Sequence, residues 1–287
     1  GWTENHMTAQ HFTGAPPPAR FNMAAYAIGR AAAAFPDKPA LLVVADPAAR
    51  APSETWTFAA LEDAVLRVAA ALADLGLKRG DRILIRLENT SAYALLFFGA
   101  IAGGFTALPA SSQLTAREAA FLLEDSGATT VALADHLPLT EIPAGVRVLA
   151  ADEITRMIRH PRRATYADTA AGDPAFLIYT SGTTSKPKGV LHAQRSAWGR
   201  RPMYDGWYGI SASDRMMHAG AFNWTYTLGV GLTDPWANGA TSIVYTGEKD
   251  PALWPRLSAQ REATLFAGVP SLYRQILKYA RPDAGSL

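Results

Sequence analysis

Short apolar runs alternate with helical patterns of about 10–15 residues along most of this chain. The clearest stretch reads as a strand over 82–87, a helix over 92–102, a strand over 105–108 and, after a further helix, a strand over 129–133. Strands that alternate with helices form βαβ units, and their parallel strands are buried on both faces and therefore apolar throughout. The alternation predicts an α/β fold built on a mostly parallel sheet.

Capping residues mark the ends of two predicted helices. Thr57 can cap a helix whose apolar residues between 61 and 75 share one face, and Gly76 suits the position just after its end. Thr115 and Glu118 have the spacing of a capping box, which predicts a helix that runs to Glu124. Further strands are predicted over 41–44, 55–57, 175–179, 241–245 and 264–266, and further helices over 22–35, 254–261 and 271–279.

An uncharged stretch over 89–116 resembles a membrane span at first sight. Its apolar part is shorter than the ~20 residues that a span needs, and glycines, Pro109 and two serines interrupt it. We therefore predict a buried helix followed by a buried strand. Gly99 and Gly103 form a GxxxG pair, which outside a membrane indicates only close packing.

Composition excludes several classes of function. The 287 residues include 27 Lys and Arg against 25 Asp and Glu, so the net charge of +2 creates no strong field for nucleic acid or an anionic membrane. The chain contains 0 cysteines, which excludes disulfides, thiolate nucleophiles and cysteine-ligated metals and suits a reducing compartment. Residues 1–6 precede Met7 and read as a cloning remnant, and no secretory signal follows Met7, so we expect a cytoplasmic protein.

One segment carries the chemistry. Residues 179–190 read Tyr-Thr-Ser-Gly-Thr-Thr-Ser-Lys-Pro-Lys-Gly-Val and follow the apolar strand directly. Five Ser and Thr hydroxyls, two glycines and two lysines in one turn form an array of donors, which favours phosphate as the ligand. The segment lacks the Gly-Lys-Ser/Thr of a Walker A loop. Ser185 and Lys188 have the Ser-x-x-Lys spacing of acyl enzymes, but Pro187 opposes the helix that this chemistry requires. An ordinary surface loop is the remaining alternative.

The segment over 180–189 resembles the phosphate-binding signature of the adenylate-forming superfamily, which comprises acyl- and aryl-CoA synthetases, nonribosomal peptide adenylation domains and beetle luciferases. One departure is Ser185, where the family usually has Gly. Other stretches are similar to the same family in the same order: 56–58, 80–83, 97–109 and 222–240. The resemblance implies stacked, mostly parallel sheets flanked by helices, as in the large N-terminal domain of acyl-CoA synthetases.

The resemblance also implies a two-step reaction. A small-molecule carboxylate attacks the α-phosphate of ATP in the presence of Mg²⁺, and coenzyme A then takes the acyl group from the adenylate. Lys188 would be the catalytic residue at this signature, whereas Lys186 stands at a variable position and is expected to be a solvated charge. By position, the residues that hold the ATP phosphates would be Thr180, Ser181, Gly182, Thr183, Thr184 and Lys188.

A second segment is placed near the substrate by the same resemblance. Asn223 and Trp224 lie where the family borders its acyl pocket, so they are candidate pocket residues, although Trp224 is equally well explained as a packing aromatic. Many relatives have His at this place. His218 is close in sequence but not at the matching position, and we interpret both His218 and His192 as structural. The Arg-rich segment over 152–163 is interpreted as a solvated helix end and loop rather than an anion site.

The resemblance predicts the domain organisation as well. One αβ subdomain would span 58–207 with the phosphate loop at 179–190, and a second would combine 12–57 with 208–287. The adenine-, ribose- and Mg²⁺-binding motifs and the small C-terminal lid domain are expected beyond Leu287, so no metal ligand is named. An incomplete second sheet would expose a strand edge, so a homo-oligomer stays open beside a monomer. Two alternatives to an acyl- or aryl-CoA ligase also stay open: a nonribosomal-type adenylation domain, and a phosphate-binding module without catalysis.

Overall fold

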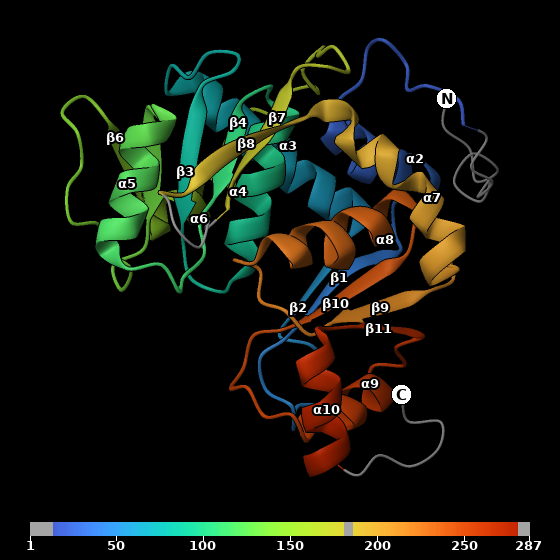
Figure 1. The fold of residues 1–287 in the computed structure, drawn as a ribbon. Coiled ribbons are helices and arrows are strands. Elements are labelled where there is room, and N and C mark those ends of the chain that lie inside the picture. The colour runs from blue at the N-terminus through green and yellow to red at the C-terminus, as the bar shows by residue number, and fades with distance from the viewer. Residues whose placement is uncertain (1–13, 181–185, 281–287) are drawn as a thin grey trace.

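The computed structural model describes residues 14–180 and 186–280, and their strands form two separate sheets (Figure 1). The six-stranded sheet has the order β6-β5-β3-β4-β7-β8. Its strands are parallel except for the antiparallel pair β7 and β8. The bounds are β3 Arg82–Arg86, β4 Thr106–Pro109, β5 Thr130–Leu133, β6 Arg147–Ala150, β7 Pro174–Thr180 and β8 Lys188–Ala193.

The five-stranded sheet combines an early and a late part of the chain, in the order β11-β9-β10-β1-β2. Only β2 is antiparallel to its neighbour. Its members are β1 Pro39–Val44, β2 Glu54–Thr57, β9 Arg215–His218, β10 Thr241–Tyr245 and β11 Leu265–Ala267. Two mostly parallel sheets flanked by helices confirm the predicted fold class.

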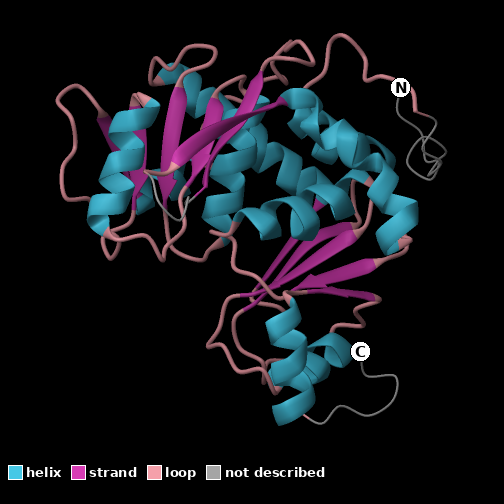
Figure 2. Cartoon of the chain, viewed as in Figure 1, coloured by secondary structure: helices cyan, strands magenta, loops and turns pink. Residues whose placement is uncertain are grey.

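Helices separate the two sheets and cover their outer faces (Figure 2). The outer face of the six-stranded sheet packs on α5, and the outer face of the five-stranded sheet packs on α9 and α10. The helices are π-helical η1 Ala25–Gly29, α2 Arg30–Ala34, α3 Phe58–Asp74, α4 Ser91–Ala102, α5 Ala116–Ser126, α6 Ala151–Met157, 3₁₀-helical η2 Gln194–Arg200, α7 Arg201–Met203, π-helical η3 Tyr204–Tyr208, π-helical η4 Thr227–Thr233, α8 Asp234–Ala237, α9 Leu253–Gln260 and α10 Pro270–Tyr279.

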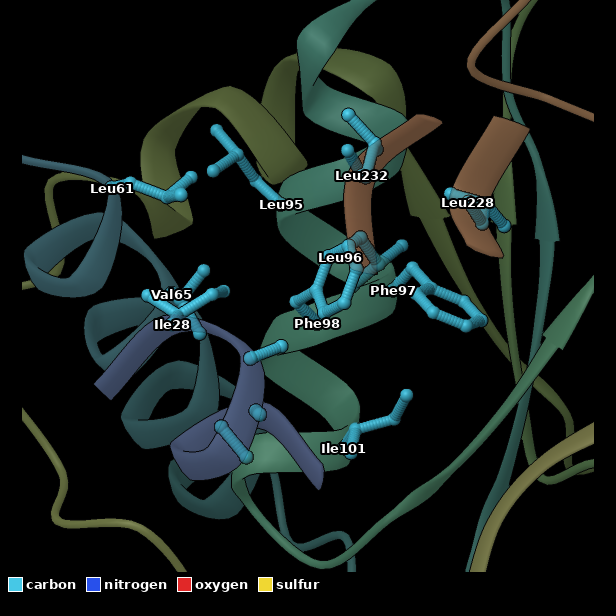
Figure 3. Close-up of a cluster of buried hydrophobic side chains, with 14 of the residues drawn as sticks. Ile28, Leu61, Val65, Leu95, Leu96, Phe97, Phe98, Ile101, Leu228 and Leu232 are labelled. Carbon is cyan, nitrogen blue, oxygen red and sulfur yellow. The ribbon is translucent and has the colours of Figure 1, made fainter. Parts of the chain in front are cut away.

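Helix α4 forms the centre of the molecule, and every one of its residues except Ala92 is buried. Phe97 packs against Phe176 of β7 with ring centroids 5.7 Å apart, and Phe98 packs against Trp236 of α8 at 5.1 Å. The Trp236 indole N–H donates to the carbonyl of Ala40 in β1. The buried helix predicted over 92–102 is therefore confirmed, and Figure 3 shows its side chains reaching neighbours on opposite sides. Among the described residues, no helix is long and apolar enough to cross a membrane.

The predicted helix ends are also confirmed. The Thr57 hydroxyl accepts a hydrogen bond from the backbone N–H of Ala60, and Gly76 adopts the left-handed conformation just after α3. Thr115 and Glu118 form both hydrogen bonds of the capping box. Pro270 occupies the first position of α10, where its missing N–H costs nothing.

Two strands carry no clear sequence signal and were not predicted. Edge strand β6 has only four residues, and two of them, Arg147 and Val148, are exposed. Strand β9 has only four residues and begins with an arginine. The alanine-rich segment predicted as a helix over 22–35 is helical, but part of it is the π-helical η1.

The Arg-rich segment over 152–163 has a structural role. Arg162 pairs with Asp74 at 2.6 Å, and Arg163 pairs with Glu62 at 3.0 Å, so the segment is tied to α3. Arg156 pairs with Asp152 one turn earlier on α6. Because carboxylates already balance these guanidinium groups, the geometry supports a solvated helix end and loop.

Gly99 allows α3 and α4 to approach closely. A Cβ atom at Gly99 would lie 2.5 Å from Cγ1 of Val68. We expect Gly99→Ala to lower the free energy of unfolding by about 1–3 kcal/mol through overpacking, measured by urea denaturation. The control is Gly199→Ala, because a Cβ there meets no atom within 4 Å. Equal stability of the two variants would contradict this account of the α3–α4 contact.

Candidate functional site

The segment predicted to bind phosphate is carried on the hairpin of β7 and β8. Thr180 and Lys188 are paired across the hairpin, where the two strands end and begin, and both are exposed. They stand at the carboxyl end of β7, which runs parallel to β4. Thr180 and Lys188 therefore lie at the edge where parallel strands of an α/β sheet usually bind ligands. Ser181, Gly182, Thr183 and Thr184 lie outside the described residues.

Helix α5 holds the base of this hairpin. The Tyr179 hydroxyl donates to Oδ2 of Asp125 at 2.7 Å. Burial, and then this hydrogen bond to a carboxylate, raise the pKa of Tyr179. The Tyr179 ring lies across Gly189, where a Cβ would be only 3.1 Å from Cζ of the ring. Lys186 Nζ is 5.5 Å from the centre of the Phe121 ring, so this ammonium lies over an aromatic face rather than only in solvent.

The segment after β9 connects the two sheets. The backbone N–H of Phe222 donates to Oδ1 of Asn89 at 2.8 Å, and Nδ2 of Asn223 donates to the carbonyl of Leu87 at 3.4 Å. Asn89 and Leu87 follow β3 of the six-stranded sheet, whereas Asn223 follows β9 of the five-stranded sheet. These contacts bring the carboxyl ends of strands from both sheets to one place.

A cavity of about 910 Å³ lies at this meeting point, and the predicted pocket residues Asn223 and Trp224 both line it. Asn223 is buried and Trp224 is half-buried. The cavity also receives Glu88 after β3 and Lys249 and Asp250 after β10. Its walls therefore carry both signs of charge together with amide and indole groups.

Adjacent residues border a second cavity. Thr225 and Tyr226, which directly follow Trp224, line a separate space of about 460 Å³ next to β7 and β8. His192 of β8 also lines this space and stacks on Phe176, with ring centroids 4.6 Å apart and an interplanar angle of 6°. Burial lowers the pKa of His192, so its ring is an uncharged surface at neutral pH.

His218 organises the turn that leads to Trp224. Its Nδ1 accepts a hydrogen bond from the Gly220 backbone N–H at 3.0 Å, and its ring packs at 4.7 Å against Tyr226 and at 5.9 Å against Trp224. The side chain is fully buried, and burial lowers the pKa of His218 to about 3. His218 is therefore a neutral structural residue, as the sequence indicated.

Arg86 positions the loops next to the cavity of about 910 Å³. The sequence analysis did not single out this residue. This buried side chain on β3 donates to the carbonyls of Leu114, Leu137 and Pro138. Burial lowers its pKa. The arginine thus joins the loops that follow β4 and β5, close to Ser111 and Gln113 in the cavity wall.

Four of the cavity residues that the sequence analysis missed share their position in the fold. Glu88 and Asn89 follow a predicted strand over 82–87, and Lys249 and Asp250 follow a predicted strand over 241–245. Polar residues just after parallel strands meet at the carboxyl edge of a sheet, so this rule could have found them. Within residues 14–180 and 186–280, no group of three His, Asp or Glu side chains could hold a metal ion.

Comparison with known proteins agrees with this geometry. A family model described as AMP-binding enzyme matches residues 28–287. The chain belongs to the AMP-binding enzyme family. A 4-hydroxybenzoate–CoA/benzoate–CoA ligase of Rhodopseudomonas palustris is 31% identical over 258 residues, covering 82% of this chain and 46% of that protein. The chain thus spans about half the length of the curated relatives it matches.

Solved structures show the same fold. A benzoate CoA ligase from Burkholderia xenovorans superposes with a TM-score of 0.77 at 28% identity, over 90% of this chain and 52% of that one. The anthranilate CoA ligase AuaEII, in complex with anthranoyl-AMP, superposes with a TM-score of 0.79 at 22% identity, over 94% of this chain and 54% of that one. The architecture of this chain is therefore that of the N-terminal part of such ligases.

Burial of neutral His218 makes stability depend on pH. Below the unfolded pKa of 6.5, His218 binds a proton in the unfolded chain but not in the folded one, which favours unfolding. The stability that neutral His218 contributes is therefore complete above that pH and is lost as the pH falls toward 3. Between about pH 7.5 and about pH 5.5, we expect the free energy of unfolding to fall by about 1.4 kcal/mol less in His218→Asn than in the unmodified chain. Urea unfolding at both pH values measures the difference. An unchanged pH dependence in the variant would show that His218 is not buried in its neutral form.

Proposed function

We propose that this chain is part of an ATP-dependent acyl- or aryl-CoA ligase that forms an acyl-adenylate from a carboxylic acid and transfers the acyl group to coenzyme A. The observation that carries the proposal is the hairpin of β7 and β8, because Thr180 and Lys188 of the signature lie paired at the carboxyl end of β7, which is parallel to β4. Membership of the AMP-binding enzyme family supports the same reaction, as do relatives named as CoA ligases.

The proposed role of the loop is to bind the β- and γ-phosphates of ATP, through Thr180, Ser181, Gly182, Thr183, Thr184 and Lys188. Attack on the α-phosphate gathers negative charge on phosphoryl oxygens, so donors held in place before the reaction lower its barrier. Lys188 adds a positive charge at the base of the loop and is the proposed catalytic residue. The pairing of Thr180 with Lys188 supports this role, because it places both side chains at the opening of one turn.

The proposed place of the carboxylate substrate is near Asn223 and Trp224. Both residues line the 910 Å³ cavity at the carboxyl ends of the two sheets, which supports a role in the substrate pocket. Relatives named for benzoate and hydroxybenzoate favour an aryl acid. Coenzyme A would supply the thiol that accepts the acyl group.

Mg²⁺ belongs to the proposal as a partner of the ATP phosphates. Mg²⁺ usually keeps several waters and needs only one or two protein ligands besides phosphate oxygens. The described residues contain no ready-made three-ligand cluster, so we assign no Mg²⁺ ligand among them. The residues named here bind and orient the phosphates.

The organisation of the chain is proposed on the same basis. Residues 58–207 would form one subdomain, and 12–57 with 208–287 a second; the strand membership of the two sheets supports this division. A C-terminal lid domain would complete the enzyme. A cytoplasmic location is proposed because the chain contains 0 cysteines, and self-association through the edge strand β11 stays a further proposal.

Lys188 provides the direct test of this function. We expect Lys188→Ala in the full-length gene product to reduce carboxylate-dependent pyrophosphate release by about 10²-fold, as for the loss of one transition-state donor. The matched control is Lys78→Ala, because Lys78 is exposed before β3, at the opposite edge of the sheet. Full activity in Lys188→Ala would remove the catalytic assignment of this lysine.

A further inference from the structure

The smaller cavity, of about 460 Å³, has walls from several separate parts of the chain. Phe176 and Ile178 come from β7, His192 from β8, and Tyr226 and Leu228 from the segment around η4. Phe97 of α4 closes the cavity from the core side. Figure 3 shows Phe97 and Leu228 next to each other, on the side of α4 that faces away from Leu61 and Val65. The volume of this cavity falls within the range of small-molecule pockets.

The charged groups at this cavity are already neutralised. Arg200 is the one formally charged residue among the described lining residues. Its Nε and Nη2 donate to the two carboxylate oxygens of Asp234, each at 2.6 Å. Asp234 is fully buried, so breaking this pair would leave a carboxylate without compensation. The cavity therefore offers no free cation to a second carboxylate.

The remaining surface favours a flat, uncharged group. Phe97, Phe176 and Tyr226 contribute aromatic rings, and the His192 ring lies parallel to Phe176. Aromatic rings pack well against other rings in offset or edge-on arrangements. The hydroxyls of Ser196 and Thr225 supply only neutral hydrogen-bonding groups.

The cavity also borders the proposed carboxylate site. Trp224 lines the larger cavity, and its ring packs edge-on, with centroids 5.0 Å apart, against Tyr226, which lines the smaller one. A carboxylate near Trp224 and a ring against Tyr226 are thus separated only by the contact between these two side chains.

We propose that the smaller cavity holds the ring of the substrate, and that the substrate is a monocarboxylic acid whose ring is uncharged. Gly229 sets the size of the ring that the cavity accepts. This inference rests on the proposed function. Acetate leaves most of the space unfilled, and a ring acid with a second, distal carboxylate places an unpaired charge against apolar walls.

Gly229 controls the free space because it lacks a side chain at the wall. A Cβ at Gly229 would lie 3.9 Å from Cζ of Arg200, an ordinary contact, and no closer atom from another element is present. A side chain can therefore be added without strain, and it would extend toward Arg200, which lines the same cavity. Gly206 lies in η3, has the same open surroundings and does not line this cavity, so it is the matched control.

The test measures ring binding directly in the 287-residue chain. Fluorine NMR titration with 4-fluorobenzoate is performed on the unmodified chain, Gly229→Ala, Gly229→Leu and Gly206→Leu. Unlabelled benzoate, 2-naphthoate, acetate and terephthalate serve as competitors. We expect Gly229→Leu to weaken 4-fluorobenzoate binding at least about 10-fold, equivalent to about 1.4 kcal/mol, and Gly206→Leu to leave it unchanged. Terephthalate and acetate should compete at least about 10-fold more weakly than unlabelled benzoate.

Gly229→Ala keeps the test valid if the leucine variant does not fold. The added methyl should weaken 2-naphthoate more than benzoate, because only the larger ring needs the lost space. Equal affinities for benzoate in all variants, or equal competition by terephthalate and benzoate, would overturn the proposal.

Pyrophosphate release in the full-length gene product separates this inference from the proposed function. Ring binding that depends on Gly229, without pyrophosphate release from any acid, would support the cavity assignment and overturn the ligase function. Benzoate-dependent pyrophosphate release with the same KM for benzoate in Gly229→Leu and the unmodified enzyme would support the ligase function and overturn the cavity assignment.

Discussion

The burial of helix α4 on every side is the constraint on which the rest of this structure depends. A helix with no polar face must be enclosed by other elements, because each exposed apolar side chain would forfeit the gain from its burial. The enclosure is complete here: β7 contacts it through Phe176, α3 through Val68, and α8 through Trp236. Trp236 in turn bonds to the carbonyl of Ala40 in β1. One uncharged helix thereby joins the cores of both sheets.

The candidate site is a consequence of this layered arrangement. Parallel strands place their carboxyl ends at one edge of each sheet, and the segments after β3 and β9 bring these two edges together. The hydrogen bonds from Phe222 to Asn89 and from Asn223 to Leu87 close this junction. Side chains separated by more than a hundred residues, such as Glu88 and Trp224, consequently line one cavity.

Hydrogen bonds from buried polar groups hold the backbone and side chains of this junction in place. His218 holds the turn at Gly220 through one ring nitrogen, and Arg86 holds two loops through backbone carbonyls. Burial raises the pKa of Asp234, and the two hydrogen bonds from Arg200 oppose that rise, so the pair is stable only with both partners present. His218 and Arg86 thus fix the backbone beside the larger cavity, whereas Asp234 fixes the Arg200 side chain in the wall of the smaller one.

The sequence by itself determined the α/β class, the helix caps at Thr57 and Thr115 and the buried character of α4, because these follow from local periodicity and from hydrogen bonds between near neighbours. It also predicted a phosphate loop over 180–189 and, through the family resemblance, pocket residues at Asn223 and Trp224. The order of the strands, the unpredicted β6 and β9, the division of strands between two sheets and the two cavities were decided only by the tertiary structure. Strand pairing joins residues far apart in the chain, and a cavity is the space that packed side chains leave between them, so neither has a local signature in the sequence.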